Sequence, residues 1–302
     1  MRIAEVTEIL RKAFAAFKRN DPLRLAGATA FFTTFALPPV LIIIIQLFGL
    51  IFNPAEVSSN LFSQLQSLLG KESSQQLHKI LTGFQELAHN WFITIGGFLF
   101  LVFVATTLFN VVSNSLNQLW NIKLDTKSGI AFRLTLRMKS IAVIIFTGLL
   151  LLAQLLASGL QALLANYLDE LWSGFNSLLY KIITQLVFVV IAACWFTVVF
   201  KYLANAHPSW KVAYTGGLFT GILFTVGKII LGLLLTFSNL KTIFGATGSF
   251  VLILLFVFYS AFIFYYGAAF TKVWADYKRK PLQLDKRAYE YTIEEVRKNK
   301  PG

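Results

Sequence analysis

Long apolar runs separated by short polar segments dominate the chain. A helix needs about 20 apolar residues to cross a bilayer, and the runs that meet this length fall at residues 25–52, 91–119, 138–166, 179–203, 212–237 and 248–274. A transmembrane barrel would instead need alternating segments of about ten residues, which the sequence lacks. The pattern therefore predicts an all-α fold, a polytopic helical membrane protein with six transmembrane helices.

Two further segments have the apolar spacing of amphipathic helices. Residues 3–19 place apolar side chains on one face and basic ones elsewhere, which predicts a helix on the membrane surface that ends at residues 20–22. Segment 53–90 carries two apolar sets at helical spacing, divided by Gly70 and a polar stretch at 71–76. We expect two outer-surface helices there, which either cover the bundle or simply dock against lipid or the spans.

Three parts of the chain follow from this pattern. Residues 1–22 form a cytoplasmic interfacial helix, residues 23–274 the six-span membrane domain, and residues 275–302 a basic cytoplasmic tail too short for a core of its own. Composition supports the membrane class, because 56% of residues are hydrophobic and 14% charged, against about 25% charged in soluble proteins.

The net charge of +13 indicates orientation more than nucleic-acid binding. Most of the 27 Lys and Arg fall in the N-terminal segment, in the loops after the second and fourth spans, and in the tail. The positive-inside rule then places both termini in the cytoplasm. Tryptophans at the predicted span ends fit aromatic belts at the two interfaces: Trp91, Trp120, Trp172, Trp210 and Trp274.

No pattern of catalytic or metal-binding residues is evident. The predicted topology puts His78 and His89 outside and His207 inside, so the three cannot share a site, and Cys194 is the only cysteine. No nucleotide-binding or metal-ligating motif occurs. Every Asp and Glu lies outside the predicted span interiors, which disfavours a carboxylate proton relay. We expect no catalytic residues, no metal, no cofactor and no enzyme activity.

A single lysine interrupts the fifth span. Lys228 shares an arc of about 80° with small or polar residues, namely Gly217, Gly221, Thr225 and Gly232. Such faces pack against other helices, so Lys228 is expected to point into the bundle, roughly 24 Å from the inner end. Two readings stay open: the ammonium either snorkels to the outer interface or faces a ligand.

Two adjacent prolines interrupt the first span. Pro38 and Pro39 remove two backbone donors, so we expect the helix to bend or break at a depth close to that of Lys228. An ordinary proline kink is the alternative. The hypothetical ligand-binding set is Lys228, Pro38, Pro39, Thr225 and Gly221.

A polar stripe marks the end of the second span. Its residues recur at helical spacing, and they are Asn110, Ser113, Asn114 and Asn117. The stripe either hydrogen-bonds neighbouring helices or lines an inner vestibule.

Several stretches resemble the YihY/virulence factor BrkB family of bacterial inner-membrane proteins. They include AGATAFFTTFALPPVLIIII, VVSNSLNQLWNIK and IFGATGSFVLILLFVFYSAFIFYYGAAFTKVWADY, and the resemblance covers nearly the whole chain. One departure is Ala269, where the family often has glutamate. The family has also been labelled ribonuclease BN, a label that the residues of this chain do not support.

The resemblance implies a multi-pass protein of the bacterial inner membrane, with suspected transport of lipid-like material. Together with Lys228 and the prolines, it predicts a binder or transporter of an amphipathic anionic molecule. The alternatives are a non-transporting envelope scaffold and, third, an intramembrane enzyme. Expected partners are membrane lipids and a second copy of the chain, joined through small-residue helix faces, with no specific nucleic acid.

Overall fold

The computed structural model describes residues 3–50, 52–86, 91–125, 138, 141–150, 153, 176–237 and 248–292. The helices in these ranges are α1 (Ile3–Arg19), α2 (Pro22–Gly49), α3 (Pro54–Leu69), α4 (Lys71–Glu86), α5 (Trp91–Leu119), α7 (Asn176–Tyr202), α8 (Trp210–Phe237) and α10 (Gly248–Tyr277). A shorter apolar helix runs over Ile141–Leu150. The strands are β1 (Ile122–Leu124), β2 (Ala206–His207), β3 (Gln283–Leu284) and β4 (Ala288–Glu290).

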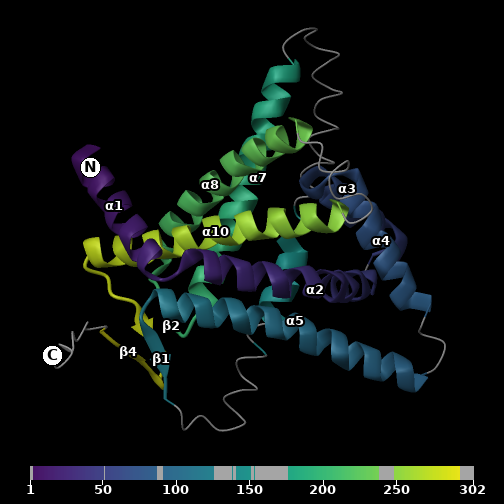
Figure 1. The fold of residues 1–302 in the computed structure, drawn as a ribbon, viewed down its shortest axis with the longest axis horizontal. Coiled ribbons are helices and arrows are strands. Elements are labelled where there is room, and N and C mark those ends of the chain that lie inside the picture. The colour runs from purple at the N-terminus through teal and green to yellow at the C-terminus, as the bar shows by residue number, and fades with distance from the viewer. Residues whose placement is uncertain are drawn as a thin grey trace, which may run out of the picture.

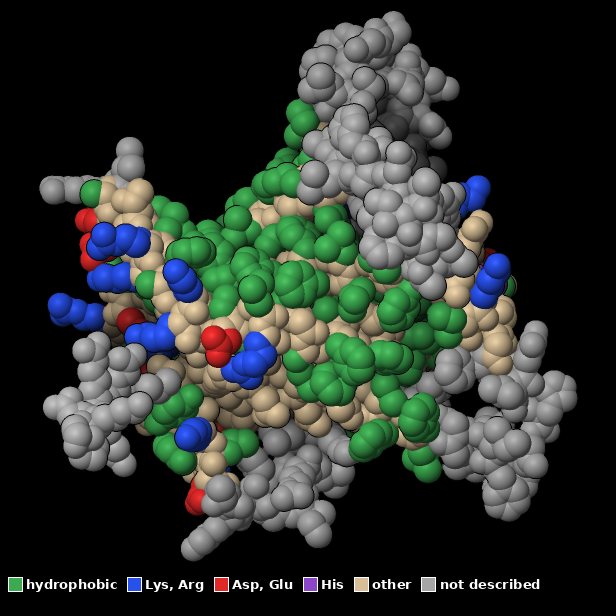
Figure 2. All heavy atoms as spheres, in the orientation of Figure 1, with side chains coloured by type: hydrophobic (Ala, Val, Ile, Leu, Met, Phe, Trp, Pro, Cys, Tyr) green, Lys and Arg blue, Asp and Glu red, His purple; other side chains and the backbone are tan. Residues whose placement is uncertain are grey.

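The helical membrane class is confirmed. Within the described residues four helices are long and apolar enough to cross a bilayer, over Pro22–Gly49, Ile182–Tyr202, Trp210–Gly232 and Phe250–Tyr277. The second predicted span coincides with the 29-residue helix α5. The third, at 138–166, lies mostly outside the described residues, so six remains a prediction. Figure 2 shows a broad apolar band, with most charged side chains of this face toward its two ends.

Helix α10 holds the bundle together. It packs against α2 on one side and α8 on the other, while α5 packs on α2 and α7 on α8. Figure 1 shows α10 running between α8 and α2. Because α2 and α8 each pack on α10, the first and fifth predicted spans approach the molecular centre from opposite sides.

The N-terminal helix is amphipathic as expected, but its apolar face is buried against protein. Ile9 and Ala13 of α1 form a cluster with Phe270 of α10, and the ring of Phe17 lies 4.8 Å from that of Phe262. Helix α10 thus covers much of the apolar face of α1 that lipid was expected to cover, and the location of α1 at the membrane surface stays a prediction. The turn to α2 lies where predicted, with Asp21 in the left-handed region at φ 50°.

The two helices predicted in segment 53–90 are confirmed as α3 and α4, whereas their place on the outer side of the membrane stays a prediction. Asn53 caps α3 by accepting a hydrogen bond from the Ala55 amide at 3.0 Å, and Gly70 (φ 84°) makes the turn between them. Leu61 and Leu77 are buried. Both helices pack on α2 and α10, so they cover one end of the bundle.

The opposite end, which we call the strand end, is closed by two small antiparallel sheets. Strand β1 pairs with β4 and β2 with β3, with Lys123 opposite Tyr289 and Ala206 opposite Leu284. The strand end thus joins the turns after α5 and α7 to the chain beyond α10 (Figure 1). Part of the basic tail predicted at 275–302 is therefore folded onto the body, up to Tyr291, whose amide donates to the Asn121 carbonyl at 2.9 Å.

Candidate ligand-binding cavity

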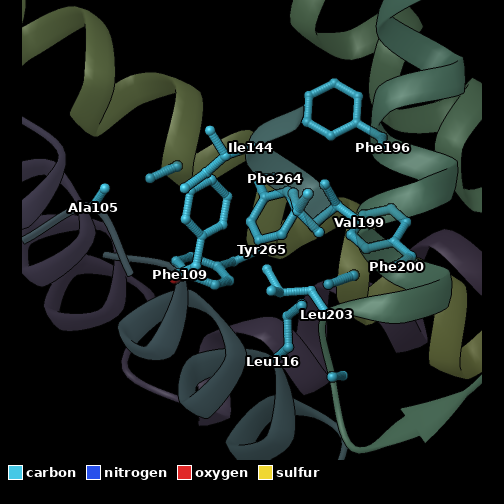
Figure 3. Packing of buried hydrophobic residues seen from close by; sticks show 14 of the residues in the cluster. Ala105, Phe109, Leu116, Ile144, Phe196, Val199, Phe200, Leu203, Phe264 and Tyr265 are labelled. Atoms are coloured by element: carbon cyan, nitrogen blue, oxygen red, sulfur yellow. The ribbon is translucent and has the colours of Figure 1, made fainter. Parts of the chain in front are cut away.

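An apolar cavity of about 390 Å³ lies between α2, α5, α7 and α10. Many of its walls are aromatic, including Phe109, Trp195 and Phe264. The other lining residues are Thr29, Thr33, Leu37, Leu65, Leu108, Val112, Thr147, Leu150, Phe188, Ile191, Ala192, Phe196, Val199, Leu203, Phe224, Phe256, Val257, Ser260 and Ala261. Figure 3 shows side chains from α5, α7 and α10 converging in this part of the core.

Most of the few polar groups on the cavity wall have partners within the protein. Thr29 Oγ1 lies 2.6 Å from the Tyr265 hydroxyl, and Trp195 Nε1 donates to Thr147 Oγ1 at 2.8 Å. Ser260 donates to the Phe256 carbonyl at 2.7 Å. Since these groups are already bonded, the cavity suits an apolar occupant such as a hydrocarbon chain.

Lys228 lies one side chain away from the cavity. Its Nζ is 3.6 Å from the centre of the Phe188 ring, and Phe188 also lines the cavity. No ion pair is found for Lys228 among the described residues. A cation on an aromatic face is favourable, by up to about 2 kcal/mol when it is desolvated, but it leaves the ammonium free to donate hydrogen bonds elsewhere.

The other predicted residues of α8 are used in helix packing. A Cβ on Gly221 would lie 2.9 Å from the Ala193 backbone nitrogen of α7, so the glycine permits close approach of the two helices. Thr225 is buried, and its hydroxyl donates to the Gly221 carbonyl at 2.8 Å. The predicted small-residue face therefore meets α7 within the same chain, and Lys228 meets the same helix through Phe188.

The double proline does not break the first span. Helix α2 is continuous from Pro22 to Gly49, with Pro38 and Pro39 buried inside it, so of the two predicted outcomes, a bend or a break, the break is wrong. Neighbouring turns and the packing of α5 and α10 on α2 hold the helix together. The preceding residue, Leu37, lines the cavity. The prolines and Lys228 are thus not side by side; their helices reach the cavity from opposite sides of α10.

The two described histidines have local roles, while His89 lies outside the described residues. His207 joins the Lys201 carbonyl at 2.7 Å and Asp285 Oδ1 at 2.8 Å, which ties the α7–α8 turn to the strand end. His78 packs with the Phe62 ring at 4.7 Å. In the described part of the chain, no group of His, Cys, Asp and Glu could hold a metal ion.

Comparison with known proteins identifies the protein family of this chain. The model of the virulence factor BrkB family matches residues 13–290. The chain belongs to this family.

Curated relatives of this BrkB-family chain are UPF0761 membrane proteins. The protein from Teredinibacter turnerae is 25% identical over 88% of this chain and 60% of its own length. The one from Mannheimia succiniciproducens is 23% identical over 87% and 88% of the two chains, and the one from Saccharophagus degradans 24% over 87% and 58%. The chain thus spans about 60% of the length of two of these relatives. No solved structure matches it.

The residues of the cavity wall were not predicted from the sequence of this BrkB-family protein. Phe188 and Trp195 lie in an apolar run where an inward position looks the same whether it meets protein or empty space. Ala269, the departure from the common family glutamate, is only 1% exposed within the core, so a charged side chain at this position would be buried.

Proposed function

We propose that this protein binds, and carries across or within the bacterial inner membrane, an amphipathic anionic molecule of lipid type. The hydrocarbon chain occupies the apolar cavity, and the anionic head group meets Lys228. One observation carries the proposal: Phe188 forms part of the cavity wall and also supports the Lys228 ammonium at 3.6 Å. An apolar chamber with a cation at its edge matches the two ends of a lipid.

The proposal also gives the protein an orientation in the membrane and assigns it no catalytic activity. The strand end carries many basic residues, such as Lys272, Lys278 and Arg279, and on the positive-inside rule it faces the cytoplasm together with both termini. Most polar groups at the cavity wall have hydrogen-bond partners within the protein, which suits binding rather than catalysis. We therefore regard the protein as a binder or transporter, not a nuclease, that works without a cofactor.

Filling the cavity tests the proposal. Ala192→Phe and Ala261→Phe each put a ring into the chamber from a different wall, from α7 and from α10. Val190→Phe is the matched control, because Val190 is also on α7 but is 57% exposed on its surface. The measurement is the lipid retained by purified protein, followed by native mass spectrometry, with lipid translocation in proteoliposomes as a second readout.

We expect both cavity variants to lose retained lipid and translocation while Val190→Phe keeps them. Cavity variants that retain lipid as well as the parent does would show that the chamber holds no hydrocarbon chain. If wild-type protein in addition neither retains nor translocates lipid, the result would favour the scaffold alternative.

A further inference from the structure

The C-terminal half of α8 lies away from the strand end, and we call it, with the residues of α7 and α10 around it, the far half. Three polar groups of the far half have no hydrogen-bond acceptor within the described structure. Among the described residues, the Lys228 ammonium contacts the Phe188 ring and forms no ion pair. The Gln185 Nε2 of α7 and the Tyr259 hydroxyl of α10 are buried atoms without a hydrogen-bond partner. All three can donate hydrogen bonds, and buried donors are almost always satisfied in folded proteins.

Helix register brings Gln185 to the neighbourhood of Lys228. Gly217 faces Ala193 and Thr197 of α7, and Gly221 faces Val189 and Ala193, so the two helices run antiparallel in contact. Continuing this register by two turns places Lys228 opposite the stretch that contains Gln185 and Phe188. Gln185 precedes Phe188 by three residues, so the two lie on one face of α7.

Tyr259 reaches the same region from the other side of α8. A Cβ on Gly227 would lie 1.0 Å from the Tyr259 hydroxyl oxygen, so this hydroxyl fills the notch at the residue directly before Lys228. Glycine at position 227 is therefore needed for the hydroxyl to be where it is. Figure 1 shows α8 leaning away from α10 beyond this region, toward its C-terminal end.

Two buried polar atoms at the strand end, Asn205 Oδ1 and Ser209 Oγ, also have no partner. Their surroundings differ, because the nearby Lys201 ammonium is bonded to the Pro208 carbonyl at 2.7 Å. In the far half, by contrast, the unpartnered donors accompany a cation that has neither an anion nor a hydrogen-bond acceptor among the described residues.

We propose that Lys228, Gln185 and Tyr259 form a phosphate-binding subsite, which recognises the phosphate of an amphipathic molecule whose chain lies in the cavity. This inference rests on the proposed function and specifies its head group. A phosphate offers several acceptor oxygens and a negative charge, so it can take one hydrogen bond from each of the three groups. Phe188 then separates the polar subsite from the apolar chamber.

The test compares lipid preference among variants in nanodiscs of equimolar phosphatidylglycerol and monogalactosyldiacylglycerol, a diacyl lipid that has no phosphate. Wild-type protein is expected to retain mainly phosphatidylglycerol. Gln185→Glu keeps the side-chain shape but puts a carboxylate beside the phosphate, and Lys228→Met removes the cation. Each should lower the ratio of retained phosphatidylglycerol to monogalactosyldiacylglycerol by about tenfold or more, as expected when a hydrogen bond to a charged group is lost.

Tyr259→Phe removes a single oxygen and should lower the ratio less, in the same direction. Tyr266→Phe is its matched control, since that hydroxyl lies on the same helix but faces the Leu10 carbonyl of α1 at 3.5 Å; it should leave the ratio unchanged. A second arm adds excess glycerol 3-phosphate, which should not abolish the preference because it has no chain to hold it. Loss of the preference in this arm would assign the site to soluble phosphate and overturn the lipid source.

The two proposals fail in different ways. Filling the cavity changes the total lipid retained, whereas the subsite variants change the ratio. If Gln185→Glu and Tyr259→Phe both keep the wild-type ratio while Ala192→Phe still empties the cavity, the subsite is wrong and the proposed function stands.

Discussion

The strand end and the far half of the bundle use polar residues in opposite ways. At the strand end, polar side chains link segments distant in sequence: Ser113 donates to the Leu203 carbonyl at 2.7 Å, and Asn117 accepts from the Asn205 amide at 2.9 Å. In the far half, the cation Lys228 and the donors Gln185 and Tyr259 have no such partner among the described residues.

This contrast separates residues that stabilise the fold from residues that the fold does not need. A bonded polar group in a membrane protein is explained by structure alone, because its alternative is an unsatisfied group in hydrocarbon. An unpartnered one costs free energy and calls for another reason. The strand end is therefore the anchor of the structure, and the far half is where ligand chemistry is expected.

The largest effect on stability should come from a substitution in the buried core of the strand end. Trp120 is fully buried, and its Nε1 donates to the Ala268 carbonyl of α10 at 2.9 Å. Trp120→Ala should lower the free energy of unfolding by about 3–5 kcal/mol, measured by reversible unfolding in detergent micelles. Trp210→Ala is the control, because Trp210 is 56% exposed, and it should cost far less. Equal losses would contradict the anchor role.

The next largest loss of stability should come from a substitution at the contact between α7 and α8. Gly221→Ala would push a methyl group against the Ala193 backbone and should destabilise by about 1–3 kcal/mol. Gly232→Ala, about three turns along the same helix, meets nothing within 4 Å and should be neutral or stabilising by up to about 1 kcal/mol. Thermal unfolding of the two variants in the same detergent compares them. Similar destabilisation by both would mean that helix packing does not distinguish the sites.

Two substitutions in the polar stripe of α5 should have smaller effects on stability, and they differ clearly from each other. Asn117→Ala leaves the buried Asn205 amide without its acceptor, and the loss should be about 1–2 kcal/mol. Asn114→Ala removes an exposed side chain from the same stripe and should change stability little. Hydrogen exchange at the Asn205 amide should quicken only in the first variant. If it also quickens in the second, the stripe acts as a whole and not through Asn117.

Much of the helix pattern could be predicted, because long apolar runs have few alternatives in a bilayer. The two amphipathic outer helices were predictable for a similar reason: leucines at helical spacing, with Gly70 between them, leave little choice. The face of α8 that carries Gly221 and Lys228 could also be predicted from small residues at helical spacing, and it does meet another helix.

Other features depend on long-range packing, which one sequence does not reveal. Strands of two or three residues carry no pattern, so the pairing of the tail with β1 and β2 could not be foreseen. Trp120 lies at a predicted span end, as belt residues do, yet tertiary contacts bury it. Pro38 and Pro39 disfavour a helix locally, but α2 continues through them. The cavity is a space between side chains of several helices, and no pattern in the sequence predicts it.

The smallest expected change in stability is also the one that best separates the two regions. Lys228→Met keeps an unbranched side chain, loses the contact of the ammonium with Phe188, and removes a charge that has no anionic partner among the described residues. Because the lost cation–π contact and the relieved desolvation oppose each other, the net change should be within about 1 kcal/mol. Lys272→Met at the strand end is the matched control, since it breaks the ion pair with Glu290 at 2.8 Å and should not affect lipid retention. Thermal unfolding and native mass spectrometry on both proteins give the comparison. A large loss of stability in Lys228→Met with unchanged lipid would make Lys228 a structural residue, and the far half would then be built on the same principle as the strand end.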